Sequence, residues 1–278
     1  MEAASLYNQI SLPLMSLGNA ALVLFLILPS AAVLGHFFGK RRRAALLAAN
    51  KDINNIVDET TLGTILALLG LLLAFSFGNA LNLSQARKAA IVNEATALGT
   101  AFLRADYLTN PGRTELKQAL LDYGRTRIVP GDGSINSLQS VQSFLAVTLE
   151  AQARLWPLTL EVTAAPTPPP IQTFVAGAMN DAIDAHLSRV ETLSNPVSDI
   201  TLAMMLASAL FALFLLGDRE GISGRALTWR TFMLSVFLFM VMVTILDTQR
   251  GSDGFIRVDD TTLKATIFDM EQAMSDSG

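Results

Sequence analysis

The stretch Thr61–Leu83 reads TLGTILALLGLLLAFSFGNALNL and carries no charged side chain. A helix needs about 20 mainly apolar residues to cross the hydrocarbon core of a bilayer, so this stretch predicts one membrane span. No obvious helix break separates it from the residues that follow. We therefore expect a single long helix that leaves the bilayer and continues to about Tyr107.

Three further charge-poor stretches predict three more spans. They are Leu17–Gly39, Ile200–Leu216 with a start near Val197, and Thr231–Leu246. The basic residues Lys40–Arg43 follow the first stretch, whereas a cleaved signal peptide has its basic residues in front, so we expect a retained helix. A short loop joins the last two stretches, which predicts an antiparallel hairpin with Trp229 as an interfacial anchor.

Composition agrees with a membrane protein and excludes several other classes. Of the 278 residues, 51% are hydrophobic and 16% are charged, whereas about a quarter of a typical soluble domain is charged. The net charge of −4 argues against a nucleic-acid partner, which usually requires a basic surplus. The absence of cysteine rules out disulfides, thiol catalysis and zinc–thiolate sites.

A long non-membrane stretch with helical periodicity, Ser84–Asn195, separates the second span from the third. Its breaks place helices near 84–108, 113–128, 136–156 and 171–193 and predict an extended linker at Ala165–Pro170. The expected fold is an all-α integral membrane protein with four transmembrane helices and a helical extramembrane domain between spans two and three. The expected segments are 1–83 and 197–246 in the membrane, 84–196 outside it, and the C-terminal tail 247–278.

The C-terminal tail contains an amphipathic pattern after the capping signal Asp259-Asp260-Thr261. Its apolar face consists of Leu263, Ile267, Met270 and Met274. We expect this helix to pack on the extramembrane domain, and the alternative is a frayed helix on the surface.

Motifs of catalysis are nearly absent. The chain has no phosphate-binding glycine loop, no nucleophile elbow and no dinucleotide fingerprint. Its two histidines, His36 and His186, fall on different elements, so a two-histidine metal site is not expected. We expect no enzyme activity, no cofactor and no metal.

One face of the second span consists of small residues. At 100° per residue, a narrow sector of the helix holds Gly63, Ala67, Gly70, Ala74 and Gly78. Small side chains allow the backbones of two membrane helices to approach closely, so this face predicts helix packing.

An adjoining face of the same span is polar at both ends and apolar in the middle. Its residues are Thr64, Leu68, Leu72, Phe75, Asn79 and Asn82. In a channel, Leu68, Leu72 and Phe75 would form a hydrophobic constriction, with Thr64 and Asn79 at its mouths. The alternative is an ordinary stripe that faces lipid or another helix.

Charged residues offer fewer candidates. Arg87 and Glu94 lie two turns apart on one helix face, and such residues usually belong to a solvated surface or an ion pair. Asp247 lies where the fourth span ends, and an acidic group there is costly unless it is solvated or paired.

Several segments together resemble a bacterial family of bestrophin-like membrane proteins, over about Thr60 to Leu263. They are Leu69–Phe75, Arg87, Asn93–Ala95, Ala97–Ala105, Met179–Asp184, Arg189, Pro196, Ile245–Asp247, and the stretch from Arg250 through Gly251 and Gly254 to Val258. Bestrophins are pentameric anion channels with four spans per subunit, a large helical cytosolic part, and a pore lined by the second span with a hydrophobic neck.

The resemblance implies a homo-oligomer, a pentamer by analogy, in the inner (plasma) membrane of a bacterium, with chloride or another anion as the permeating species. Two features depart from the bestrophin pattern. The pair Asp259-Asp260 is not a dense acidic clasp, and Thr248–Arg250 lacks the family's proline. Calcium gating is therefore not expected.

Membrane orientation is predicted differently by two arguments. The short loops after the first and third spans are rich in Lys and Arg, which places both loops in the cytoplasm and the helical domain outside. A bestrophin has the reverse orientation.

Two functional hypotheses follow. In the first, the chain is an oligomeric channel, most simply for anions, whose second span lines the pore. In the second, it is a non-conducting membrane scaffold or sensor that binds a partner through its helical domain. A ring of subunits around an open axis would favour the first.

Overall fold

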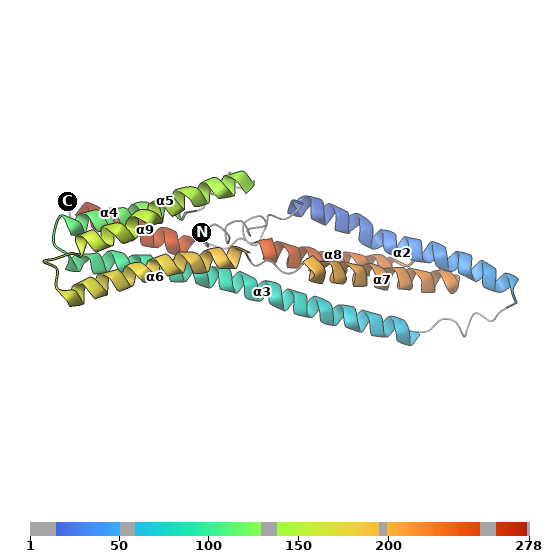
Figure 1. Ribbon diagram of the computed structural model, residues 1–278. Helices are drawn as coiled ribbons and strands as arrows, with labels where there is room; N and C mark the ends of the chain where they lie inside the picture. The colour runs from blue at the N-terminus through green and yellow to red at the C-terminus, as the bar shows by residue number, and fades with distance from the viewer. Residues whose placement is uncertain (1–14, 51–58, 129–137, 195–198, 251–259, 277–278) are drawn as a thin grey trace. The chain divides into compact units, whose positions relative to one another are not determined.

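The computed structural model describes residues 15–50, 59–128, 138–194, 199–250 and 260–276. All regular secondary structure within these ranges is helical (Figure 1). Four of the helices are long and apolar enough to cross a membrane. The predicted all-α membrane fold is therefore confirmed. The proposed start of the third span at Val197 and the capping residue Asp259 lie outside the described residues.

The chain divides into two compact units, which we call the membrane unit and the helical unit. The membrane unit contains α2 (Leu17–Ala48), α7 (Asp199–Ile222), α8 (Trp229–Arg250) and the part of α3 (Glu59–Arg104) up to Ser84. Its apolar core joins side chains from all four helices, among them Leu28, Leu69, Leu213 and Ile245. Within this unit α2 packs against both α7 and α8.

Helix α3 is continuous over 46 residues and ends in a short 3-10 helix, η1 (Ala105–Tyr107). This agrees with the single long helix expected from the sequence. The other three spans are all longer than expected, and α2 runs to Ala48 rather than Gly39. Helix α7 runs to Ile222 rather than Leu216, and α8 runs from Trp229 to Arg250 rather than from Thr231 to Leu246.

The helical unit contains α3 from Gln85 onward, η1, α4 (Gly112–Thr126), α5 (Leu138–Val162), α6 (Pro169–Ser194) and α9 (Thr261–Asp276). Leu98, Leu116, Leu155 and Met179 are among its buried core residues. The apolar face of α9 joins the same core through Leu263, Ile267 and Met270. The tail helix thus packs on the extramembrane domain and is not a frayed surface helix.

The extended linker predicted at Ala165–Pro170 is wrong. Residues 163–167 form turns and bends, and α6 already begins at Pro169. Proline suits the first helical turn because its backbone lacks an N–H that would have no partner there. Helix α5 likewise continues past its predicted end at residue 156, through Pro157 to Val162.

Candidate functional site

Helix α3 buries one face in the membrane unit. Leu62, Leu69, Leu73, Ser76 and Ala80 are buried, and their spacing follows the helical repeat. Leu69, Leu73 and Ala80 belong to the same core as residues of α2, α7 and α8. The orientation of the span about its own axis is set by these apolar contacts.

The stripe predicted to line a pore lies outside this buried face. Leu68 is 56% exposed and Phe75 is 69% exposed. Thr64, Asn79 and Asn82 are also exposed, and Leu72 at the edge is half-buried. The polar–apolar–polar stripe therefore faces away from the subunit's own core, so it is open to lipid, to water or to another subunit.

The small-residue face is open as well. Gly63, Ala67, Gly70 and Ala74 are exposed and Gly78 is half-buried. A Cβ atom placed on Gly63, Gly70 or Gly78 would have no other heavy atom within 4 Å. Among the described residues, no helix of the same chain packs closely on these glycines. Helix packing on this face thus stays a prediction.

Close packing of glycines does occur within the subunit, between α2 and α7. A Cβ atom on Gly35 would lie 1.9 Å from the carbonyl oxygen of Phe214, and one on Gly39 would lie 2.2 Å from that of Asp218. On α7, a Cβ on Gly217 would lie 2.0 Å from the oxygen of Ala32. The two backbones touch, and any side chain on these glycines would separate them.

The contact pairs between α2 and α7 rise together along both helices, so the two spans are parallel. We call this contact the glycine seam, formed by Gly35, Gly39, Gly217 and Gly221. Sequence reasoning missed it, although a visible signal exists because each span contains glycines four residues apart. That spacing places both glycines of a helix on one face.

Helix α7 ends in a capping arrangement that also ties it to α2. Gly224 has φ +70° and follows the end of the helix, while the N–H of Arg225 donates to the carbonyl oxygen of Glu220. The guanidinium of Arg43 donates to the carbonyl oxygen of Ile222 at 2.8 Å. A cation thus satisfies a carbonyl at the negative end of the helix dipole.

The helical unit contains a buried cluster of charges centred on Glu94, which is 1% exposed. Arg127 donates to one carboxylate oxygen at 2.5 Å, and Arg189 donates to the other at 2.6 Å. Arg189 also donates to the backbone oxygen of Arg127. The cluster ties together three elements of the unit: α3, the end of α4 and α6.

His186 and Arg87 lie in the same unit and are also buried. Burial, together with the nearby charges of Arg127 and Arg189, lowers the pKa of His186 to about 4 against the opposing effect of Glu94. The imidazole is therefore neutral at pH 7. Arg87 donates to the backbone oxygen of Thr192 at 3.2 Å, whereas Glu94 forms its ion pairs with Arg127 and Arg189.

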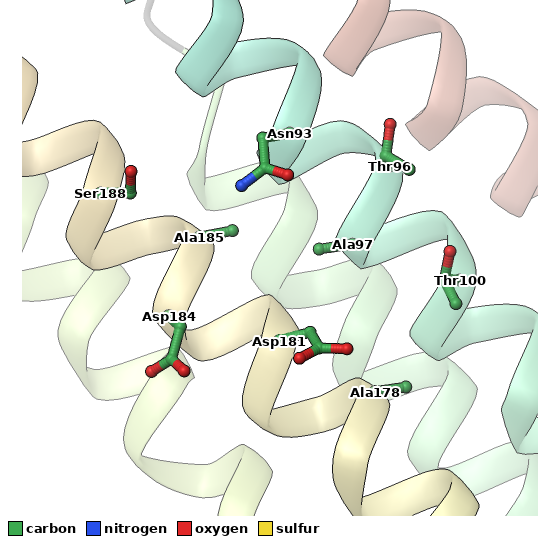
Figure 2. A pocket seen from close by; sticks show the side chains of 9 residues that line it. All are labelled: Asn93, Thr96, Ala97, Thr100, Ala178, Asp181, Asp184, Ala185 and Ser188. Atoms are coloured by element: carbon green, nitrogen blue, oxygen red, sulfur yellow. The ribbon is translucent and has the colours of Figure 1, made fainter.

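A polar groove lies between α3 and α6 within the helical unit (Figure 2). Asn93, Thr96 and Thr100 line it from α3, and Asp181 and Asp184 line it from α6. The carboxylate of Asp184 accepts a hydrogen bond from the Asn180 amide at 3.0 Å. The groove is open to solvent, and its groups are those of a hydrated surface.

Asp247 at the end of α8 is 4% exposed. The sequence singled it out as an acidic group that must be solvated or paired, and its burial means that bulk water does not solvate it. Its neighbour Thr248 is also buried and donates to the carbonyl oxygen of Thr244.

These features define an all-helical membrane protein. Its second span continues into a helical unit, and the polar–apolar–polar stripe of that span is exposed. The model of the bestrophin-like domain matches residues 26–263 of the chain. The chain therefore belongs to the bestrophin-like family, which confirms the resemblance drawn from the sequence. No curated protein and no solved structure matches it.

Proposed function

We propose that the chain is one subunit of an oligomeric ion channel whose pore is lined by α3. The observation that carries the proposal is the exposed stripe of Leu68, Leu72 and Phe75 between Thr64 and Asn79. A helix that faces only lipid does not require polar groups at both ends of such a stripe. Membership of the bestrophin-like family supports the same reading.

The apolar part of the stripe acts as the gate in this proposal. When copies of α3 surround an axis, Leu68, Leu72 and Phe75 form the narrowest ring. A narrow apolar collar cannot replace the hydration shell of an ion, so it holds the pore shut until it widens. Thr64 and Asn79 lie at the two mouths, where hydroxyl and amide groups stay in contact with water.

The small-residue face lies beside the stripe and provides the contact between copies. Gly63, Gly70 and Gly78 have free space above them, and another helix can approach their backbones closely. By analogy with bestrophins the assembly is a pentamer in the bacterial inner membrane. By the same analogy chloride or a similar anion is the permeating ion; the amide of Asn79 can donate to an anion and can also accept from the water around a cation.

The proposal is tested by anion flux through liposomes that contain the purified protein. Replacement of Leu68, Leu72 and Phe75 together by Ala widens the collar and is expected to raise the flux at least several-fold. The substitution Asn79→Asp, which places a negative charge at the mouth, is expected to lower the preference for anions over cations more than it lowers total flux.

The chain offers a matched control for the triple substitution. Leu22, Phe25 and Leu26 on α2 have the same side-chain types and are exposed. Their replacement by Ala leaves the flux at the wild-type level if α2 faces lipid. Absence of flux from the wild type and the α3 triple variant, with insertion and assembly verified, contradicts the channel. The scaffold that binds a partner through its helical unit is then the better account.

A further inference from the structure

A second surface of the membrane unit is an apolar groove between α2 and α7. Ile27, Ala31 and Leu34 line it from α2, and Leu210, Phe211 and Phe214 line it from α7. Its volume is about 450 Å³. The hydroxyl of Ser30, which also lines the groove, donates to the carbonyl oxygen of Leu26 at 2.6 Å. The groove therefore offers almost only hydrocarbon to an occupant.

The glycine seam explains why a groove exists there. Because Gly35 and Gly217 bring the two backbones into contact, the large side chains beside them cannot lie between the helices. Leu34 and Phe211 are exposed on the two sides and form the walls. Phe38 and Phe214 have ring centroids 6.0 Å apart and close the groove toward the C-terminal ends of both helices.

Cations follow immediately beyond that closed end. Arg41 lies seven residues after Leu34, which is two turns along the same helix face and about 10 Å of rise. Its guanidinium stacks on the Phe37 ring at 4.4 Å. Lys40 and Arg42 are exposed beside it, and Arg42 approaches Asp218 at 3.7 Å with its side chain 55% exposed.

In the part of the chain that the structure describes, no carboxylate forms an ion pair with Lys40 or Arg41. Arg43 has a separate role, since it donates a hydrogen bond to the carbonyl oxygen of Ile222 at the end of α7. The surface thus combines a hydrocarbon groove with two cations, Lys40 and Arg41, that have no ion-pair partner among the described residues, and this combination matches an amphiphile that has an anionic head.

We propose that the groove between α2 and α7 binds the acyl chain of an anionic phospholipid, whose phosphate is held by Lys40 and Arg41. Basic clusters beside membrane helices attract anionic lipid headgroups. The acyl chain lies along Ile27 to Leu34, one to two turns from these cations. This site is independent of the proposed pore on α3.

The test uses the full chain purified in detergent and native mass spectrometry of retained lipid. Phosphatidylglycerol and phosphatidylcholine with identical acyl chains are added at equal concentrations. The wild type is expected to retain phosphatidylglycerol preferentially, and the double variant Lys40→Gln, Arg41→Gln should lose roughly tenfold or more of that preference. The control Arg154→Gln, an exposed cation of the helical unit, should keep it.

A third variant tests the groove itself. Ala207 lines the groove and is exposed, so Ala207→Trp should fill it and lower the retention of both lipids. If this variant does not fold, the double variant alone decides the question, because its two cations lie on the surface. The proposal is overturned by equal retention of the two lipids in the wild type, or by a preference that survives the double variant. It is also overturned if Ala207→Trp changes the oligomeric mass and leaves lipid retention unchanged, since the groove then receives a second copy.

Discussion

At the scale of single residues, the carboxylate of Glu94 links several elements of the helical unit. It is buried between two arginines that are themselves buried, so each charge depends on the others for its solvation. A buried ion pair adds little over an apolar alternative, but removal of one partner leaves an uncompensated charge. The three side chains therefore link α3 to α6 and to the end of α4.

Glu94→Gln is expected to lower the free energy of unfolding by about 3–5 kcal/mol, because both arginines lose their counter-charge inside the unit. Glu150→Gln is the control, since Glu150 pairs with Arg154 on an exposed helix face and contributes only about 0.3–0.5 kcal/mol. Thermal unfolding of both variants in detergent measures the difference. Equal midpoints for the two variants would show that the cluster is not a structural centre.

His186 predicts a dependence of stability on pH. Its pKa is about 4 in the folded protein and 6.5 in a model peptide, so only the unfolded chain binds a proton between these values. The contribution of His186 to stability is complete above pH 6.5 and is lost as the pH falls toward 4, by about 2 kcal/mol at pH 5.

Thermal midpoints at pH 7.5 and pH 5 measure this contribution of His186. The variant His186→Gln, which cannot take up the proton, should show a smaller fall in the midpoint than the wild type. An equal fall in both proteins would assign the pH dependence to other groups, such as the carboxylates.

At the scale of elements, the glycine seam decides how α2 and α7 pack. Gly217→Ala places a methyl group against the carbonyl oxygen of Ala32, and backbone atoms cannot move aside as a flexible side chain can. We expect the variant to separate the two helices, with a loss of about 1–3 kcal/mol, which is typical of an overpacked site. Gly18→Ala on α2 is the control, because no other heavy atom lies within 4 Å of its added Cβ.

The midpoint of thermal unfolding in detergent, measured for both variants, tests the glycine seam. A midpoint for Gly217→Ala as high as that of Gly18→Ala would contradict the close contact. The prediction separates this seam from the small-residue face of α3, where Gly70→Leu should leave the subunit folded and weaken only the association of copies.

The existence of each span could be predicted from the sequence, because a run of about 20 residues without charge permits few structures other than a membrane helix. The ends of the helices could not be predicted from the sequence. Helix α7 extends past Asp218, the charge that ends the apolar run in the sequence, and Arg42 of α2 approaches this carboxylate. The start of α6 at Pro169 was hidden by the surrounding prolines, which are equally compatible with an extended chain and a first helical turn.

The candidate site could be predicted only in part. Helical projection of α3 shows from the sequence that the small residues and the stripe lie on neighbouring faces. Only the tertiary contacts show that a third face, which includes Leu69 and Leu73, is the buried one. The partners of Glu94 lie 33 and 95 residues away along the chain, so no local pattern brings them together.

At the scale of the whole molecule, the channel proposal assigns the open faces of α3 to contacts between copies of the chain. The stripe and the small-residue face both lie outside the subunit's own core, and the channel proposal requires that copies of α3 meet around a shared axis. Because the chain has no cysteine, a single introduced cysteine reports its own surroundings without any background.

The most direct measurement compares Leu68→Cys with Leu26→Cys in membranes treated with a short bismaleimide. Both leucines are 56% exposed, one on α3 and the other on α2, so they differ in position and not in accessibility. The account predicts covalent dimers of the Leu68→Cys protein and monomers of the Leu26→Cys protein. Monomers from Leu68→Cys together with dimers from Leu26→Cys would place α2 between the copies and contradict a pore lined by α3.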